Sequence, residues 1–287
     1  MIYISSSCIK ANNIEDAVMA LVKKGFTNIE LSGGTRYDKN ALDKLIQLKK
    51  EHQINFLLHN YFPTPQIPFV INLASLEPEI ATYSLEHIKK AIDWSIALGA
   101  TKYAFHAGFL INIPLKQVGK KIEKVKLFDQ QDAIQQFELN LKSIVEYNDS
   151  RIQLYIENNV LSESNFNSFH QKDIFFFTSS KNLTQFKRPR ELKILLDAAH
   201  LRVSCNSLSL NFEQEFKELY SQTDYFHISD NDGKSDTNKA LKEDSELYEV
   251  LSRNWKSDKV VTIEVYSGMD EIKNTHRILE KLNDKND

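Results

Sequence analysis

Several short apolar runs along this chain end in a side chain that can bind a metal ion or transfer a proton. The acidic or imidazole residues at these ends are His59, His106, Glu157, Asp197, His227 and Glu264. The run that ends in Asp197 also carries an imidazole three residues later, at His200. Short uninterrupted apolar runs are typical of strands buried in a parallel sheet. The pattern therefore predicts buried strands that end in metal-type ligands.

Any one of these residues has an ordinary structural explanation. A single histidine at a strand end is more often a hydrogen-bonded structural residue, and a single glutamate can cap a helix or form a salt bridge. The joint pattern is harder to explain in that way, because burying several carboxylates and imidazoles together is costly without a compensating cation. A bound divalent metal provides that charge, and mixed nitrogen and oxygen ligands favour Zn²⁺ or Mn²⁺ over Ca²⁺.

The elements that would position these side chains alternate between strands and helices. The expected strands are 2–5, 28–31, 54–59, 102–106, 152–157, 194–197, 224–228 and 260–265. Amphipathic helical patterns occupy 14–22, 42–46, 84–98, 133–147, 212–219, 247–255 and 270–282. Eight such strands predict an α/β protein with a (β/α)8 barrel, in which active sites lie at the carboxyl ends of the strands. No glycine-rich phosphate-binding motif follows a strand, which argues against a dinucleotide-binding fold.

The bulk properties are those of an ordinary globular protein. The 287 residues show no composition break, so we expect a single barrel domain over residues 1–287. The net charge of −3 provides no general attraction to nucleic acid or acidic membranes. The two cysteines form no disulfide framework, and no signal peptide or membrane-spanning run is evident. These features predict a soluble cytoplasmic protein, for which homo-oligomerisation is possible.

Three features outside the strand ends have alternative interpretations. The lysine-rich stretch with Lys116, Lys120, Lys121, Lys124 and Lys126 is interpreted as a solvated face, with an anion site as the alternative. Residues 158–187 are long and irregular, and their Phe175–Phe177 run is either a lid or a small satellite cluster. Arg202 is a candidate for binding a substrate oxygen or phosphate, and a structural salt bridge is the alternative.

Several longer segments carry a family resemblance. They are Phe69–Ser75, Ser84–Ala100, His106–Gly108, Ile156–Asn158, Leu196–His200 and Tyr225–Asp230. In their order and spacing over nearly the whole chain they resemble the xylose-isomerase-like barrel superfamily. That superfamily contains sugar and sugar-phosphate isomerases and epimerases, and also the type-IV apurinic endonucleases. The first three segments look like the endonuclease branch in particular.

The resemblance implies specific roles for the strand-end residues. The shared metal ligands would be Glu157, Asp197, His227 and Glu264, with Glu157 and Glu264 also acting on protons. The endonuclease branch has further zinc ligands, and these correspond to His59, His106, His200 and Asp236. That branch has an Asp-x-His pair where this chain has Asp236-Thr237-Asn238. Asn238 replaces a good ligand with a poor one, so a third metal is in doubt.

The favoured function is a metal-dependent isomerase or epimerase of a sugar or sugar phosphate that works through an enediolate. A small-molecule substrate is expected and a nucleic-acid partner is not. The alternative is a metal-dependent apurinic/apyrimidinic endonuclease that hydrolyses a phosphodiester. A barrel that binds a sugar-like ligand without turnover is a third class, since fold alone does not determine function.

Overall fold

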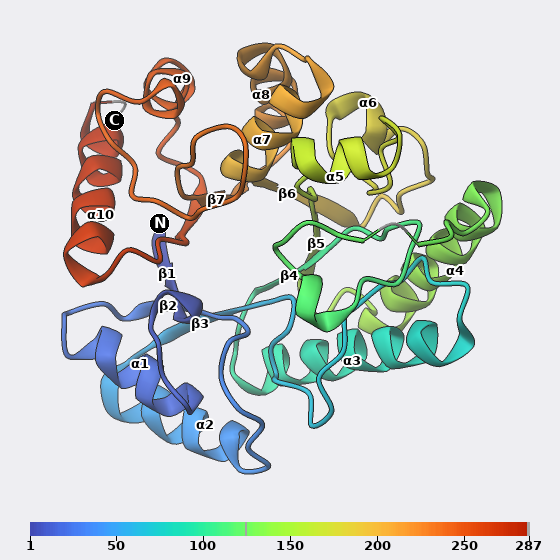
Figure 1. The fold of residues 1–287 in the computed structure, drawn as a ribbon. Helices are drawn as coiled ribbons and strands as arrows, with labels where there is room; N and C mark the ends of the chain where they lie inside the picture. Colours follow the sequence, from blue (N-terminus) through green and yellow to red (C-terminus); the bar gives the residue numbers. More distant parts are fainter. Residues whose placement is uncertain (124, 286–287) are drawn as a thin grey trace.

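Eight parallel strands form a closed barrel at the centre of the molecule (Figure 1). The structure is a computed structural model that describes residues 1–123 and 125–285. The strands are β1 Ile2–Ser5, β2 Asn28–Leu31, β3 Asn55–His59, β4 Lys102–His106, β5 Gln153–Glu157, β6 Leu192–Asp197, β7 Tyr225–Ile228 and β8 Val260–Ile263. They pair in sequence order, and β1 closes the barrel against β8. The expected (β/α)8 barrel is thereby confirmed, with strand bounds within two residues of those expected.

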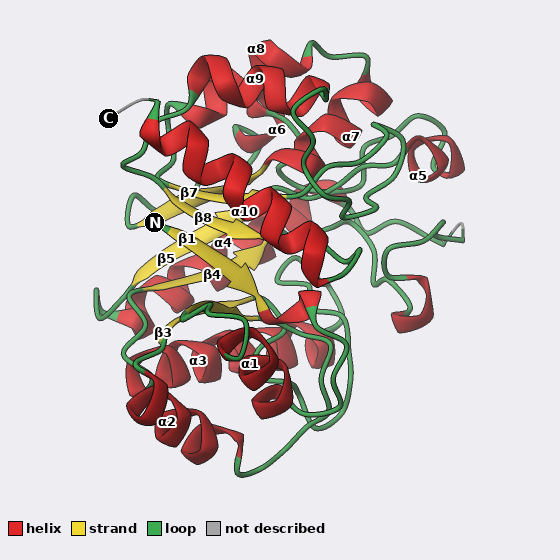
Figure 2. Ribbon diagram, turned by 90° about the vertical axis from the view of Figure 1, so that its left-hand side faces the viewer, coloured by secondary structure: helices red, strands yellow, loops and turns green. Residues whose placement is uncertain are grey.

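Helices surround the strands (Figure 2). They are α1 Ile14–Val22, α2 Ala41–His52, α3 Pro78–Ala97, α4 Gln130–Asn148, α5 Glu163–Ser168, α6 Ser180–Leu183, α7 Ala198–Leu208, α8 Phe212–Tyr220, α9 Glu246–Asn254 and α10 Met269–Asp284. Two 3-10 turns, η1 Ser6–Cys8 and η2 Leu115–Gln117, complete the regular structure of the described residues. None of the described helices is long and apolar enough to cross a bilayer.

The helix α7 does not follow from the sequence pattern. Most of its residues are buried, and many of them are small. A helix covered on most sides has no polar stripe, so the 3.6-residue alternation that reveals surface helices is absent. The helix starts directly after β6, where the Asp197 side chain accepts a hydrogen bond from the His200 backbone N–H. That N-cap brings the acid and the imidazole together.

The interior of the barrel is filled by alternate residues of the strands. One buried cluster consists of Tyr3, Leu57, Ala104, Tyr155, Leu195 and Tyr225. Successive side chains on a strand point to opposite faces, so residues two positions further along point into the same lumen. Those positions are occupied by residues such as His59, Glu157 and His227. The strand period therefore directs the strand-end ligands into the mouth of the barrel.

Two irregular segments are joined to each other over this mouth. Phe109, after β4, forms an antiparallel bridge with Phe175, in the loop between β5 and β6. Backbone hydrogen bonds from Leu110 to Ile174 and from Phe176 to Gly108 extend the pairing. Phe176 also packs against Phe137 of α4, with ring centroids 5.3 Å apart. This phenylalanine run is therefore part of the packed core.

Candidate metal centre

Glu157 lies at the centre of the polar cluster in the barrel mouth. Its carboxylate is fully buried, and Oε2 lies 2.6 Å from His59 Nε2 and 3.2 Å from His106 Nδ1. The other oxygen, Oε1, lies 3.5 Å from His227 Nδ1 and 3.6 Å from His200 Nδ1. Four imidazoles from four parts of the chain thus converge on one carboxylate.

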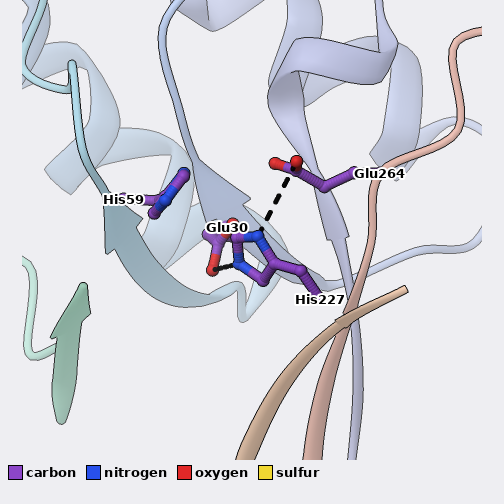
Figure 3. A group of neighbouring side chains, drawn as sticks. All are labelled: Glu30, His59, His227 and Glu264. Carbon is purple, nitrogen blue, oxygen red and sulfur yellow. Dashed lines mark hydrogen bonds and ion pairs between the residues drawn. The ribbon is translucent and has the colours of Figure 1, made fainter. Parts of the chain in front are cut away.

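Of the four residues expected to share one metal, His227 is the one that the other three surround. Ligand atoms of Glu157, Asp197 and His227 all lie within 4.8 Å of one another. Glu264, which follows β8, places Oε2 3.7 Å from the same Nδ1 of His227 (Figure 3). Among the described residues, Glu157 Oε1, Asp197 Oδ2 and His227 Nδ1 have no hydrogen-bond partner. Buried polar atoms are rarely left without partners, so these three atoms fit the ligands of a divalent cation.

Glu30 is a member of this cluster that the sequence reasoning missed. It lies on β2, is fully buried, and its Oε2 lies 3.1 Å from His227 Nε2 (Figure 3). The hydroxyls of Tyr225 and Thr262 also donate hydrogen bonds to this oxygen. A carboxylate on the second nitrogen of a ligand histidine fixes its tautomer and turns the first nitrogen toward a metal. The available signal was the isolated acid in the apolar strand Ile29-Glu30-Leu31.

Further possible ligands lie on both sides of this group. His59, His106 and Glu157 also have ligand atoms within 4.8 Å of one another, which outlines a second metal position sharing Glu157. On the other side, His200 Nε2 lies 3.3 Å from Asp236 Oδ2 and 3.8 Å from Asp197 Oδ2. The predicted ligands therefore lie in one mouth but in overlapping groups, since Glu264 groups with Glu30, His59 and His227 rather than with Glu157 and Asp197.

Burial and charge shift the acidity of these groups in different directions. Burial alone would raise the pKa of Glu157, but the charges of His106 and His59 lower it well below its usual range. Burial raises the pKa of Asp197 to about 7, and it raises the pKa of Glu264 against the opposing charge of His227. Burial also lowers the pKa of His106 to about 4. Carboxylates and imidazoles in the mouth thus share protons, and, against the lowering effect of burial, the carboxylates also raise the pKa of His59, His200 and His227. A divalent cation would replace these protons as the compensating charge.

A cavity of about 630 Å³ opens above the cluster, and His106, His200 and Asp236 lie in its wall. Arg202 is not among the residues that line it. Its guanidinium instead donates to Asp230 Oδ1 and to the carbonyl of Asn231, and pairs with Glu246. These contacts fit a structural salt bridge, which is the alternative interpretation of Arg202. Substrate binding by Arg202 stays a prediction that the geometry does not support.

Comparison with known proteins finds one family model that covers nearly all of the chain. A family described as xylose isomerase-like TIM barrel matches residues 18–284. No curated protein matches the sequence. A solved structure described as a D-tagatose 3-epimerase-like protein is 19% identical, with 99% of this chain and 98% of that chain covered and a TM-score of 0.73.

Two further solved structures have different printed activities. The 3-keto-D-glucoside 4-epimerase of E. coli is 13% identical, covers 98% of both chains and has a TM-score of 0.60. Endonuclease IV of Thermus thermophilus is 12% identical, covers 98% of this chain and 99% of that chain, and also has a TM-score of 0.60. At these identities the likeness concerns the fold alone.

Proposed function

The chain belongs to the xylose isomerase-like TIM barrel family, and from that premise we propose that it is a metal-dependent isomerase or epimerase of a sugar or sugar phosphate. The observation that carries the proposal is the placement of two glutamates around one imidazole. Glu157 and Glu264 end different strands, and each has an oxygen within 3.7 Å of His227 Nδ1. Two carboxylates that approach one point from different strands can serve opposite sides of a substrate carbon.

The chemistry is a proton transfer next to a carbonyl group. One glutamate removes the proton from the carbon beside the carbonyl, and the bonding electrons move onto the carbonyl oxygen to give an enediolate. The other glutamate returns a proton, either to the opposite face of that carbon or to the neighbouring carbon that carried the carbonyl; in the second case the hydroxyl proton of the first carbon moves to the former carbonyl oxygen, so that the first carbon becomes the new carbonyl. The first outcome is an epimerisation and the second an isomerisation. Positioned carboxylates typically contribute about 10²–10⁴-fold to such steps.

The remaining residues hold the reacting groups in place. Glu157, Asp197, His227 and Glu264 would hold the metal, and the mixed oxygen and nitrogen donors suit Zn²⁺ or Mn²⁺. When bound, the metal supplies positive charge that stabilises the developing negative charge on the substrate oxygens. Glu30 holds the His227 ring through Nε2.

The test is a screen of ketoses and ketose phosphates with metal-loaded protein in D₂O. We expect one substrate to be converted to its epimer or isomer with deuterium incorporated at the reacting carbon. Elemental analysis of the purified protein should find zinc or manganese. A protein that binds neither metal in titrations, or that converts no substrate in the screen, would contradict the proposal.

A second candidate function is supported by the pair of histidines on the far side of Glu157. His59 and His106 both contact Glu157 Oε2, so a second metal could share this carboxylate. Adjacent metals sharing a carboxylate are suited to phosphodiester hydrolysis, as in an apurinic endonuclease. Asn238 in place of a ligand and the net charge of −3 count against DNA as substrate. We expect slow or no cutting of abasic duplex DNA. Robust metal-dependent nicking that is lost in Glu264→Gln would reverse the ranking.

A further inference from the structure

The lysine-rich stretch after β4 is divided by the structure into two groups. Lys120 and Lys121 line the 630 Å³ cavity above the metal centre, whereas Lys116 and Lys126 do not. All four are exposed, so the first two lie where the cavity opens to solvent. Lys124 lies outside the described residues. The solvated-face interpretation therefore still suits Lys116 and Lys126 but leaves the position of the other two to be explained.

The segment that carries Lys120 and Lys121 is held in place by a buried side chain. Asn165 of α5 donates a hydrogen bond from Nδ2 to the Lys120 carbonyl at 3.2 Å and accepts one at Oδ1 from the Ile122 N–H at 2.7 Å. Asn165 is only 7% exposed, and the Ile122 side chain is buried. This double contact fixes the backbone on either side of Lys121 beside α5 (Figure 1). The two ammonium groups are thus attached to an anchored segment.

No acidic side chain among the described residues compensates the charge of these lysines. Among residues 1–123 and 125–285, none forms an ion pair with Lys120 or Lys121. The only acidic side chain in the cavity wall among these residues is Asp236, which is engaged with His200. A pair of cations without acidic partners at a cavity opening attracts an anion.

Much of the remaining wall is apolar. Val70, Ile71, Phe109, Ile122 and Phe175 line the cavity, and all five are buried. A volume of about 630 Å³ lies in the range that accepts drug-sized ligands, which is considerably more than a bare monosaccharide fills. A small sugar phosphate would leave this apolar surface in contact with water. The wall therefore favours a ligand that has an apolar group in addition to its sugar.

We propose that Lys120 and Lys121 form an anion subsite for a phosphate group on a large, partly apolar sugar derivative, of which a nucleoside-diphosphate-linked sugar is the simplest example. The proposal rests on the proposed function in one respect, namely that the sugar end of this ligand lies at the metal centre. The apolar wall accommodates the non-sugar part, and the two ammonium groups bind its phosphate oxygens. Lysine binds phosphate as a point charge, so two neighbouring lysines suit a diphosphate.

The test compares two double variants in an equilibrium binding assay with uridine diphosphate as the probe. Lys120→Ala/Lys121→Ala removes the subsite, and Lys116→Ala/Lys126→Ala is the matched control with the same loss of charge from the same stretch. We expect the first to weaken binding by about tenfold or more, and the second by less than about twofold. Equal losses in the two variants, or no binding by the wild-type protein, would overturn the proposal.

Two more measurements separate the contribution of the anchored segment to ligand binding from that of the apolar wall. Asn165→Ala keeps both lysines but releases their segment, and it should weaken binding of the same probe; unchanged affinity would contradict the anchored subsite. Inorganic pyrophosphate should bind at least about tenfold more weakly than uridine diphosphate, because it has the same diphosphate but lacks the base and ribose that would contact the wall. Equal affinity for the two probes would refute the large-ligand part of the proposal. Because none of these assays measures turnover, they separate failure of the subsite from failure of the isomerase proposal.

Discussion

The two ends of the barrel both contain buried or partly buried carboxylates, but these carboxylates differ in how completely they are hydrogen-bonded. At the amino end of the strands, Asp224 accepts hydrogen bonds from the Tyr155 hydroxyl at 2.8 Å and from Lys193 Nζ at 2.9 Å. Lys102 Nζ lies 3.7 Å away from the same carboxylate. Both oxygens of Asp224 therefore have a donor, and two lysines balance its negative charge.

At the carboxyl end, several buried carboxylates have an oxygen without a donor. Glu30, Glu157, Asp197 and Asp236 each have one buried oxygen without a hydrogen-bond partner among the described residues. Imidazoles are their main neighbours there. Burying such groups without partners costs stability, which fits the cation site proposed for this end, whereas the contacts of Asp224 at the amino end fit a role in stabilising the fold. The same division between ends is a general property of barrel enzymes.

The largest expected effect concerns the two proposed catalytic glutamates. Glu157→Gln and Glu264→Gln keep the side-chain shape but cannot accept a proton, so each should lower the rate by about 10²-fold or more. Asp224→Asn is the matched acid-to-amide control at the amino end and should leave the rate unchanged. Turnover of the identified substrate and metal content are measured together, and metal content should fall less than activity. Wild-type rates in both glutamine variants with metal bound would contradict proton transfer by these residues.

The next effect concerns Glu30, whose carboxylate contacts Nε2 of His227. Glu30→Gln removes the charge that holds the Nε2 side of this ring, so the metal dissociation constant should rise about 10–100-fold. Metal titration by calorimetry measures it, and the nitrogen chemical shifts of His227 report on its tautomer. The Asp224→Asn variant again serves as the control. An unchanged metal affinity and tautomer in Glu30→Gln would show that Glu30 has only a packing role.

The two ends should also differ in their response to pH. Burial lowers the pKa of His227 and His200, but neighbouring carboxylates, led by Glu30 for His227 and by Asp197 for His200, raise both well above the usual value. The folded metal-free protein therefore keeps protons that unfolded imidazoles release above about pH 6.5, so its stability falls as the pH rises. The free energy of unfolding can fall by at most about 1.4 kcal/mol for each imidazole and each pH unit.

Urea denaturation at pH 6.5 and 8, with and without a chelator, checks this effect. Metal binding replaces the protons, so the loss should be smaller in the metal-loaded protein. At the amino end, burial raises the pKa of Asp224, but hydrogen bonds from Lys193 and Tyr155 lower it below its usual value. The contribution of Asp224 is thus lost only in acid, as the pH falls below about 4. A chelated protein equally stable at both pH values would contradict the expected charge state of the mouth.

The smallest effect is expected at the amino end itself. Asp224 is 39% exposed, so solvent weakens its ion pairs, and Asp224→Asn should lower the free energy of unfolding by less than about 1 kcal/mol. Urea denaturation at pH 7 measures this change. A loss of metal affinity in this variant comparable with that of Glu30→Gln would show that the two ends are not independent.

The sequence by itself determined the barrel and most of the polar cluster. Apolar runs report burial, and the alternation of strands with amphipathic helices allows few architectures, so the positions of His59, Glu157 and His227 at the mouth followed from strand order. The helix α7 did not follow, because its buried residues lack the alternation on which such predictions depend.

Tertiary structure alone decided which groups touch. Glu30 resembled an ordinary strand residue until barrel closure brought β2 near β7 and placed its carboxylate on His227. Five lysines of one stretch had the same local signature, and the hydrogen bonds between Asn165 and the backbone of Lys120 and Ile122 hold Lys120 and Lys121 at the cavity. The physical reason is the same in both cases: a sequence pattern reports burial and local geometry, whereas contacts between distant segments depend on how the barrel and its loops close.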